Sequence, residues 1–100
     1  MVIANNAVDI GTLIVCTPGV VGGEPRISGT RISVRNIVTW TRMGWSPEEI
    51  IRHYTHLALA QVHAALTYYY ANKDEMDKSI AADEAEEAQI VAEAASKTRS

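Results

Sequence analysis

Four arginines between Pro25 and Pro47 are the residues whose type and spacing best suit a chemical role. They are Arg26, Arg31, Arg35 and Arg42, and no carboxylate lies among them. Because guanidinium groups bind phosphate well, Arg26, Arg31 and Arg35 are candidates for contacting a nucleic acid backbone. The net charge of -3 hides this local positive field. In the alternative interpretation, the arginines keep the surface soluble and pair with carboxylates of the C-terminal tail.

The glycines and the proline around these arginines predict a stiff double turn that would hold the arginines in place. Gly22 and Gly23 adopt positive φ at no steric cost, and Gly29 supplies a second pivot. Pro25 fixes its own φ and restricts the residue before it. We therefore expect short extended arms on either side of a rigid connection.

Apolar runs beside this turn predict a small sheet of two or three short strands. Residues 13–16 form an apolar run that ends at Thr-Pro-Gly, and residues 26–28 and 30–32 alternate polar with apolar side chains. Ile27 and Ile32 are expected to point inward. Such short strands need a helix beneath them or a partner chain beside them.

Start and stop signals predict three helices after the sheet. Ser33 can cap the first helix, and Ser46-Pro47 with Glu49 forms a capping box at the start of the second. The expected ranges are 34–43, 47–54 and about 59–72. The fold class is therefore mainly α with a small N-terminal β-element, and the second and third helices have helix-turn-helix proportions.

The third helix has two open interpretations. Its predicted outward residues are Ala60, Gln61, Ala64, Thr67, Tyr68 and Ala71. Gln61 could bond an adenine edge and Ala64 could touch a thymine methyl, with Thr67 and Tyr68 beside them. The face carries no basic residue, however, and small uncharged side chains equally suit packing against a protein.

No constellation of residues predicts catalysis or a metal site. His53, His56 and His63 lack further ligands at suitable spacing, and a histidine near a helix C-terminus is explained by the helix dipole. No nucleophile is placed with a base and an orienting carboxylate. The single Cys16 is expected to be a small buried group in a strand. We expect no enzyme, no cofactor and no small-molecule substrate.

The composition changes near Asn72. Residues 73–100 hold eight carboxylates against four basic residues and only four large apolar ones, namely Met76, Ile80, Ile90 and Val91. The apolar core is therefore expected to end near Asn72, which divides the chain into a domain at 1–72 and an acidic tail at 73–100. The tail is rich in helix formers and is expected to be helical on a partner and partly disordered otherwise.

The length of 100 residues limits the chain to one small domain, for which oligomerisation is an early expectation. A homodimer would double the arginine patch. No window is long and apolar enough to span a membrane, and the low cysteine content fits a reducing compartment, so we expect a soluble, cytoplasmic protein.

A resemblance to a known family extends these expectations. The run Gly22-Gly23-Glu24-Pro25-Arg26-Ile27-Ser28-Gly29-Thr30-Arg31-Ile32, followed by Gly44-Trp45-Ser46-Pro47-Glu48-Glu49-Ile50, resembles the family called domain of unknown function 433 over roughly residues 13 to 80. The resemblance implies a homeodomain-like helix-turn-helix protein, often encoded beside a PIN-type ribonuclease toxin and regarded as its antitoxin. This sequence departs from the family pattern at two places. Glu24 stands where a basic residue is frequent, and Ala58 and Ala60 stand where Thr and Glu are usual at the start of the third helix.

The resemblance and the residues together predict two activities. One is operator DNA binding as a dimer through the arginines and the third helix. The other is neutralisation of a PIN-type toxin through the tail, in which Lys97 or Arg99 would reach the acidic nuclease site and Met76, Ile80, Ile90 and Val91 would pack on the toxin. The alternative is a protein-protein interaction module that binds no DNA.

Overall fold

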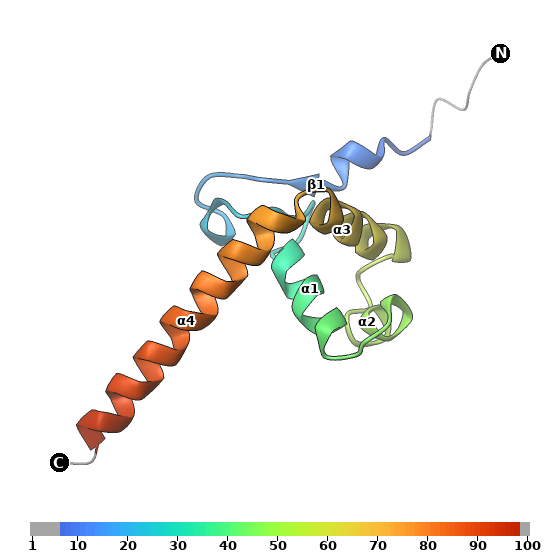
Figure 1. Cartoon of the computed structure of the whole chain (residues 1–100). Coiled ribbons are helices and arrows are strands. Elements are labelled where there is room, and N and C mark those ends of the chain that lie inside the picture. The colour runs from blue at the N-terminus through green and yellow to red at the C-terminus, as the bar shows by residue number, and fades with distance from the viewer. Residues whose placement is uncertain (1–6, 99–100) are drawn as a thin grey trace.

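Four helices and a two-stranded sheet make up the part of the chain that the computed structural model describes, which is the backbone of residues 7–98 and the side chains of residues 7–94. The helices α1–α3 form a bundle beside the sheet, and α4 projects away from it (Figure 1). The mainly helical fold class with a small N-terminal β-element is confirmed. In chain order the elements are 3₁₀ turn η1 (Ile10–Thr12), β1 (Ile14–Val15), 3₁₀ turn η2 (Val21–Gly23), β2 (Arg26–Ile27), α1 (Val34–Arg42), α2 (Pro47–His53), α3 (Leu59–Ala71) and α4 (Lys73–Thr98).

The sheet is held by one antiparallel pairing. Ile14 lies opposite Ile27, and Val15 lies opposite Arg26. Two strands form, which is the smaller of the two predicted numbers. Residues 30–32 add no third strand, and the returning chain pairs with β2 through an isolated bridge between Arg26 and Ser33. The Thr30 amide closes the turn by donating to the Ile27 carbonyl at 3.1 Å, and the Ile27 amide joins the two arms by donating to the Ile32 carbonyl at 2.9 Å.

Positive φ values occur at the predicted pivots of the double turn. Gly22, Gly23 and Gly29 have φ of 64°, 78° and 79°. A Cβ is disfavoured in this conformation, so glycine is the natural residue at each position. The chain can therefore reverse direction on both sides of β2.

Side-chain caps set the helix starts close to the predicted positions. The Ser33 hydroxyl accepts from the Asn36 amide at 3.0 Å, and Ser46 and Glu49 form the expected capping box. The start of α3 differs, because Ala58 has no side-chain acceptor and only the Gln61 side chain accepts from the Ala58 amide, at 2.7 Å. The Gln61 amide, which a capping side chain would usually bind, donates instead to the Ala58 carbonyl at 3.0 Å.

Helix α3 is the centre of the fold, since it packs against α1, α2 and both strands. The core extends past the predicted boundary near Asn72, because the first turns of α4 lie over the domain and bury Ile80 to 3 % exposure. The core residues are Ile27, Val34, Ile37, Val38, Ile50, Leu57, Val62, Ala65, Tyr69 and Ile80.

The predicted burial of Cys16 is wrong. Cys16 is exposed, because β1 ends at Val15 and the cysteine falls in the loop that follows. Leu59 is also exposed, at the first position of α3, where the helix emerges from the connection with α2.

Helix α4 gives the molecule its elongated form. Its 26 residues span about 39 Å, and the molecule measures 72 × 28 × 23 Å along its principal axes. Among the described helices, none combines the length and apolar character needed to cross a membrane.

Candidate functional site

Arg26 braces the double turn from within. Its guanidinium donates to the Thr30 carbonyl at 3.0 Å and to the Thr17 hydroxyl at 2.9 Å, while its Nε is buried and has no partner among the described residues. Two of its donor groups are therefore committed to the loops on either side of β2. In this position Arg26 shapes the turn more than it offers charge to a ligand.

Arg35 joins the turn, α1 and α4. One of its terminal nitrogens lies 3.5 Å from a Glu24 carboxylate oxygen, and the other forms an ion pair with Asp83 of α4. Arg31, by contrast, is exposed and makes no ion pair within the described part of the chain.

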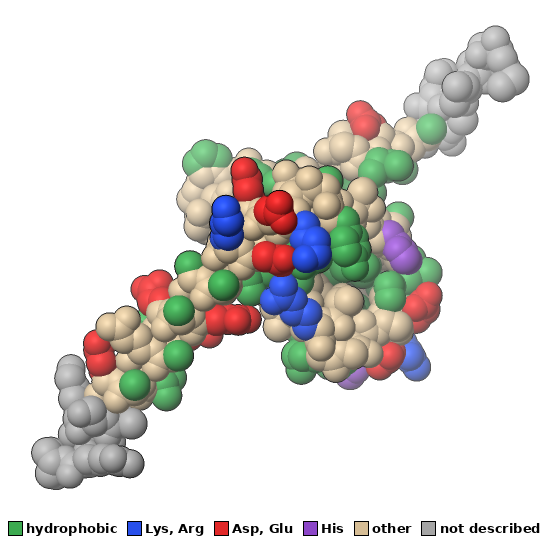
Figure 2. All heavy atoms as spheres, viewed as in Figure 1, with side chains coloured by type: hydrophobic (Ala, Val, Ile, Leu, Met, Phe, Trp, Pro, Cys, Tyr) green, Lys and Arg blue, Asp and Glu red, His purple; other side chains and the backbone are tan. Residues whose placement is uncertain are grey.

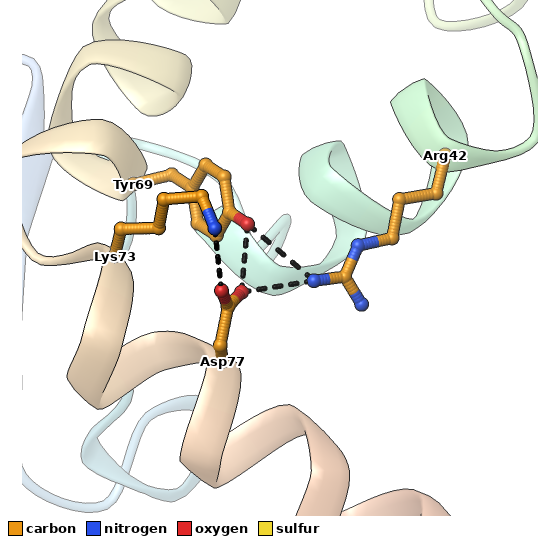
Figure 3. Close-up of polar contacts among 4 residues, drawn as sticks. All are labelled: Arg42, Tyr69, Lys73 and Asp77. Atoms are coloured by element: carbon orange, nitrogen blue, oxygen red, sulfur yellow. Dashed lines mark hydrogen bonds and ion pairs between the residues drawn. The ribbon is translucent and has the colours of Figure 1, made fainter.

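A second polar cluster ties α1 and α3 to α4 (Figure 3). Asp77 accepts from Arg42 at 2.9 Å, from the Tyr69 hydroxyl at 2.7 Å and from Lys73 at 2.8 Å. The hydrogen bonds from Lys73 and then Tyr69 lower the pKa of Asp77 below its usual value. The same contact with Asp77 raises the pKa of Lys73, and the Tyr69 hydroxyl is the main cause that raises the pKa of Arg42.

The arginines are therefore opposed by carboxylates that lie far away in the sequence. The prediction of an unopposed positive patch is wrong for Arg35 and Arg42, since Glu24, Asp77 and Asp83 neutralise them. The alternative prediction, in which arginines pair with carboxylates of the tail, is confirmed for these two. Figure 2 shows Lys and Arg side chains interspersed with Asp and Glu where α4 leaves the domain.

The outward face of α3 is narrower than predicted. Ala64 is only 7 % exposed and Tyr68 is half-buried against the core, because helices and strands surround α3 on most sides. Gln61 is half-buried and uses its side chain to cap the helix. Thr67 is exposed as predicted, and the exposed residues of this helix are Leu59, Ala60, His63, Thr67, Tyr70 and Ala71.

Aromatic rings stack along the edge between α1 and α2, a feature that the sequence patterns did not reveal. Trp40 stacks on Tyr54 and on Trp45, with ring centroids 4.5 and 6.1 Å apart. The exposed His53 stacks on Trp45 at 4.5 Å. His53 therefore packs on an aromatic face, and no group of three or more potential metal ligands occurs among the described residues.

The predicted partner-binding residues of the tail divide into two sets. Met76 is half-buried against the core and Ile80 is buried, so both anchor α4 to its own domain. Ile90 and Val91 lie farther along the helix and are 57 % and 67 % exposed. The side chain of Lys97 and the whole of Arg99 lie outside the described residues.

The residues that sequence reasoning missed are the carboxylates that hold α4 in place. Asp77 and Asp83 look like ordinary members of an acidic tail, and Glu24 looks like a turn residue. The helical spacing of Met76, Ile80 and Asp83 was the available signal, because residues four and three apart share a helix face.

Comparisons with known proteins agree on one family. A family described as "Protein of unknown function (DUF433)" matches residues 14–69. A crystal structure of a DUF433 member protein from Anabaena variabilis ATCC 29413 is similar, with 37 % sequence identity, a TM-score of 0.66, and coverage of 70 % of this chain and 69 % of that one. No curated protein matches the chain.

Proposed function

Since the chain belongs to the DUF433 family, whose function is unknown, we propose that it is an antitoxin-like protein-binding module that presents the outer half of α4 to a partner protein. The partner proposed is a PIN-type ribonuclease, as the resemblance implies. The observation that carries the proposal is the contrast along one helix: Ile80 is buried in the domain, whereas Ile90 and Val91 are exposed on the part that projects. Large apolar side chains exposed together on a charged helix are typical of an interface.

The attachment of α4 supports this proposal. Asp77 and Asp83 bind arginines of α1, and Ile80 packs in the core, so the helix is fixed in direction before any partner arrives. Preorganisation of this kind reduces the entropy that binding must overcome. A partner would meet a helix that already holds its bound conformation.

The test begins with the neighbouring genes, one of which is expected to encode a PIN-type ribonuclease. The chain is then purified with that protein, and complex formation and RNA cleavage are measured. We expect a complex in which cleavage is inhibited. The double variant Ile90→Ser with Val91→Ser should weaken inhibition about tenfold, because two apolar side chains are lost from the contact. The double variant Ala85→Ser with Ala92→Ser on the same helix is the matched control. Full inhibition by the first variant, or none by the unaltered chain, would contradict the proposal.

Operator DNA binding is a second candidate function. The observation in its favour is Arg31 beside the double turn, which is exposed and makes no ion pair with any described residue; a homodimer would present it twice. Pairing of Arg35 and Arg42 with carboxylates, and the burial of Ala64, reduce the number of residues available for this role. The predicted cytoplasmic location and homodimer belong to the same proposal.

A gel shift with the DNA upstream of the gene, across a salt series, separates the two candidates. If DNA binds, affinity should fall steeply with salt, and Arg31→Ala should reduce the slope by about one phosphate contact per protomer. If no shift occurs at low salt, DNA binding is rejected and protein binding is the remaining candidate function.

A further inference from the structure

We propose that the outer half of α4 and the turn at Val21–Gly22 form a groove for a basic, amphipathic segment of the partner. This inference rests on the proposed protein-binding function and adds the chemistry of the partner and the face of α4 that it occupies. It follows from the direction in which the side chains of α4 point, from the residues that line the groove, and from the charge of the helix and of the groove.

The face of α4 that contacts the domain continues beyond it. Successive residues of an α-helix are rotated by about 100°, so Ile90 and Val91 lie on either side of the direction set by Met76, Ile80 and Asp83. The first three side chains meet the core or Arg35, whereas Ile90 and Val91 meet no core residue. The uncovered stretch is therefore continuous with an interface that the chain already makes with itself.

A groove lies where this face leaves the domain. The domain lines it with Val21, Gly22 and the ion pair of Glu24 with Arg35, and α4 lines it with Asp83, Glu86, Glu87 and Ile90. Asp83 is paired with Arg35, but Glu86 and Glu87 form no ion pair with any described residue. The groove thus offers an apolar contact at Val21 and Ile90 together with two unneutralised carboxylates.

Charge selects the occupant. Between Ser79 and Ala94 every ionisable side chain is a carboxylate, and there are five of them. On the visible face of this projecting segment, Figure 2 shows acidic and apolar side chains and no basic ones. A second copy of α4 would place carboxylates against carboxylates, which is unfavourable, and nucleic acid would be repelled. A segment with lysines or arginines flanking an apolar stripe matches both features of the groove.

The probe for this inference is a fluorescein-labelled amphipathic peptide with a leucine stripe and lysine at its other positions. Its affinity for the full chain is measured by fluorescence anisotropy at low and physiological salt. Two comparison peptides replace all lysines by glutamate, or all leucines by serine. We expect the lysine-leucine peptide to bind and both comparison peptides to bind at least about tenfold more weakly, because each lacks one of the two complementary features.

Matched variants of the chain locate the contact. Glu86→Gln with Glu87→Gln should weaken binding about fivefold at low salt. Glu93→Gln should have an effect below about twofold, because Glu93 does not line the groove and lies about 10 Å farther along the helix than Glu86. Ile90→Ser with Val91→Ser should weaken binding about tenfold, and Ala85→Ser with Ala92→Ser on the opposite face should not. Circular dichroism checks that each variant keeps its helix content.

Three outcomes overturn the inference. The first is equal weakening of peptide binding by the groove variants and by their controls. The second is binding of the acidic peptide as tight as that of the lysine-leucine peptide. The third is self-association in sedimentation that Ile90→Ser with Val91→Ser abolishes, since the occupant is then a second copy. If the peptide binds but no complex with the ribonuclease forms, only the proposed toxin is rejected. If the ribonuclease complex forms and the groove variants do not weaken it, only the groove is rejected.

Discussion

At the scale of single residues, Asp77 is the junction between α4 and the domain. It is on α4, yet it accepts hydrogen bonds from Arg42 of α1 and Tyr69 of α3 as well as from Lys73 of its own helix. Exposed ion pairs contribute little one at a time, but several charges that share one acceptor restrain it more effectively. The charge of this carboxylate therefore contributes to the attachment of α4, beside the ion pair of Asp83 and the burial of Ile80.

We expect this junction to weaken in acid. The pKa of Asp77 is lowered in the folded chain, so its contribution to stability is present above the ordinary pKa of an aspartate and is lost as the pH falls through the lowered value. The pKa of Lys73 is raised, so its contribution is present below the ordinary pKa of a lysine and is lost as the pH rises through the raised value. Thermal melts of the unaltered chain and of Asp77→Asn should differ at neutral pH and converge in acid. A difference in Tm that persists unchanged at low pH would contradict this account.

At the scale of elements, the helices depend on different kinds of stabilisation. Local capping starts α1 and α2, whereas α3 begins at Ala58 without a side-chain acceptor and is held by packing on α1, α2 and the sheet. Helix α4 is anchored only through its first turns. Substitutions in these elements should therefore have distinct effects.

The missing cap of α3 predicts a stabilising substitution. Ala58 is exposed and has the extended φ and ψ of an N-cap residue, -104° and 155°. A serine there can accept from an amide in the first turn, so Ala58→Ser should raise the free energy of unfolding by about 1 kcal/mol. Urea denaturation measures the change, and Ala60→Ser within the same turn is the control, which should bring no gain.

The anchoring of α4 predicts that its two isoleucines contribute very differently to the free energy of unfolding. Ile80→Ala removes buried methyl groups from the core and should lower the free energy of unfolding by about 2 to 4 kcal/mol. Ile90→Ala changes an exposed position and should alter it by less than about 0.5 kcal/mol. Chemical denaturation of both variants checks this pair, and equal losses would mean that Ile90 is also packed against the domain.

At the scale of the whole molecule, a compact domain carries a long acidic helix that projects from it (Figure 1), whose base packs on the core and whose residues 84–94 are exposed. The domain binds α4 through apolar and ionic contacts, and the outer half remains available to another molecule. This arrangement separates the part that gives stability from the part proposed to bind the partner.

Amide hydrogen exchange should reveal this division. Amides of residues 76–83 lie where α4 packs on the core, so they should exchange more slowly than those of residues 87–94, which are in the exposed half of the same helix. Mass spectrometry of peptic fragments measures both segments in one experiment. Addition of the partner should slow the outer segment; equal protection along the free helix would contradict the division.

Features that depend on neighbouring residues in the sequence could be predicted, whereas features that depend on residues far apart in the sequence could not. The double turn, the caps at Ser33 and Ser46 and the ends of the first three helices were predicted closely, because each depends on residues within four or five positions. Whether residues 30–32 form a third strand was left open. In the structure they do not, because beyond the turn at Gly29 the returning chain pairs with β2 only through the bridge between Arg26 and Ser33.

The sequence by itself determined where this chain turns and where its helices begin, since backbone stereochemistry and capping act locally. Only the tertiary structure decided which side of α3 is exposed, that α4 is anchored by Ile80, and that Arg35 and Arg42 are neutralised. The physical reason is that burial and charge pairing depend on residues about 30 to 50 positions apart, whose meeting is set by the packing of whole helices.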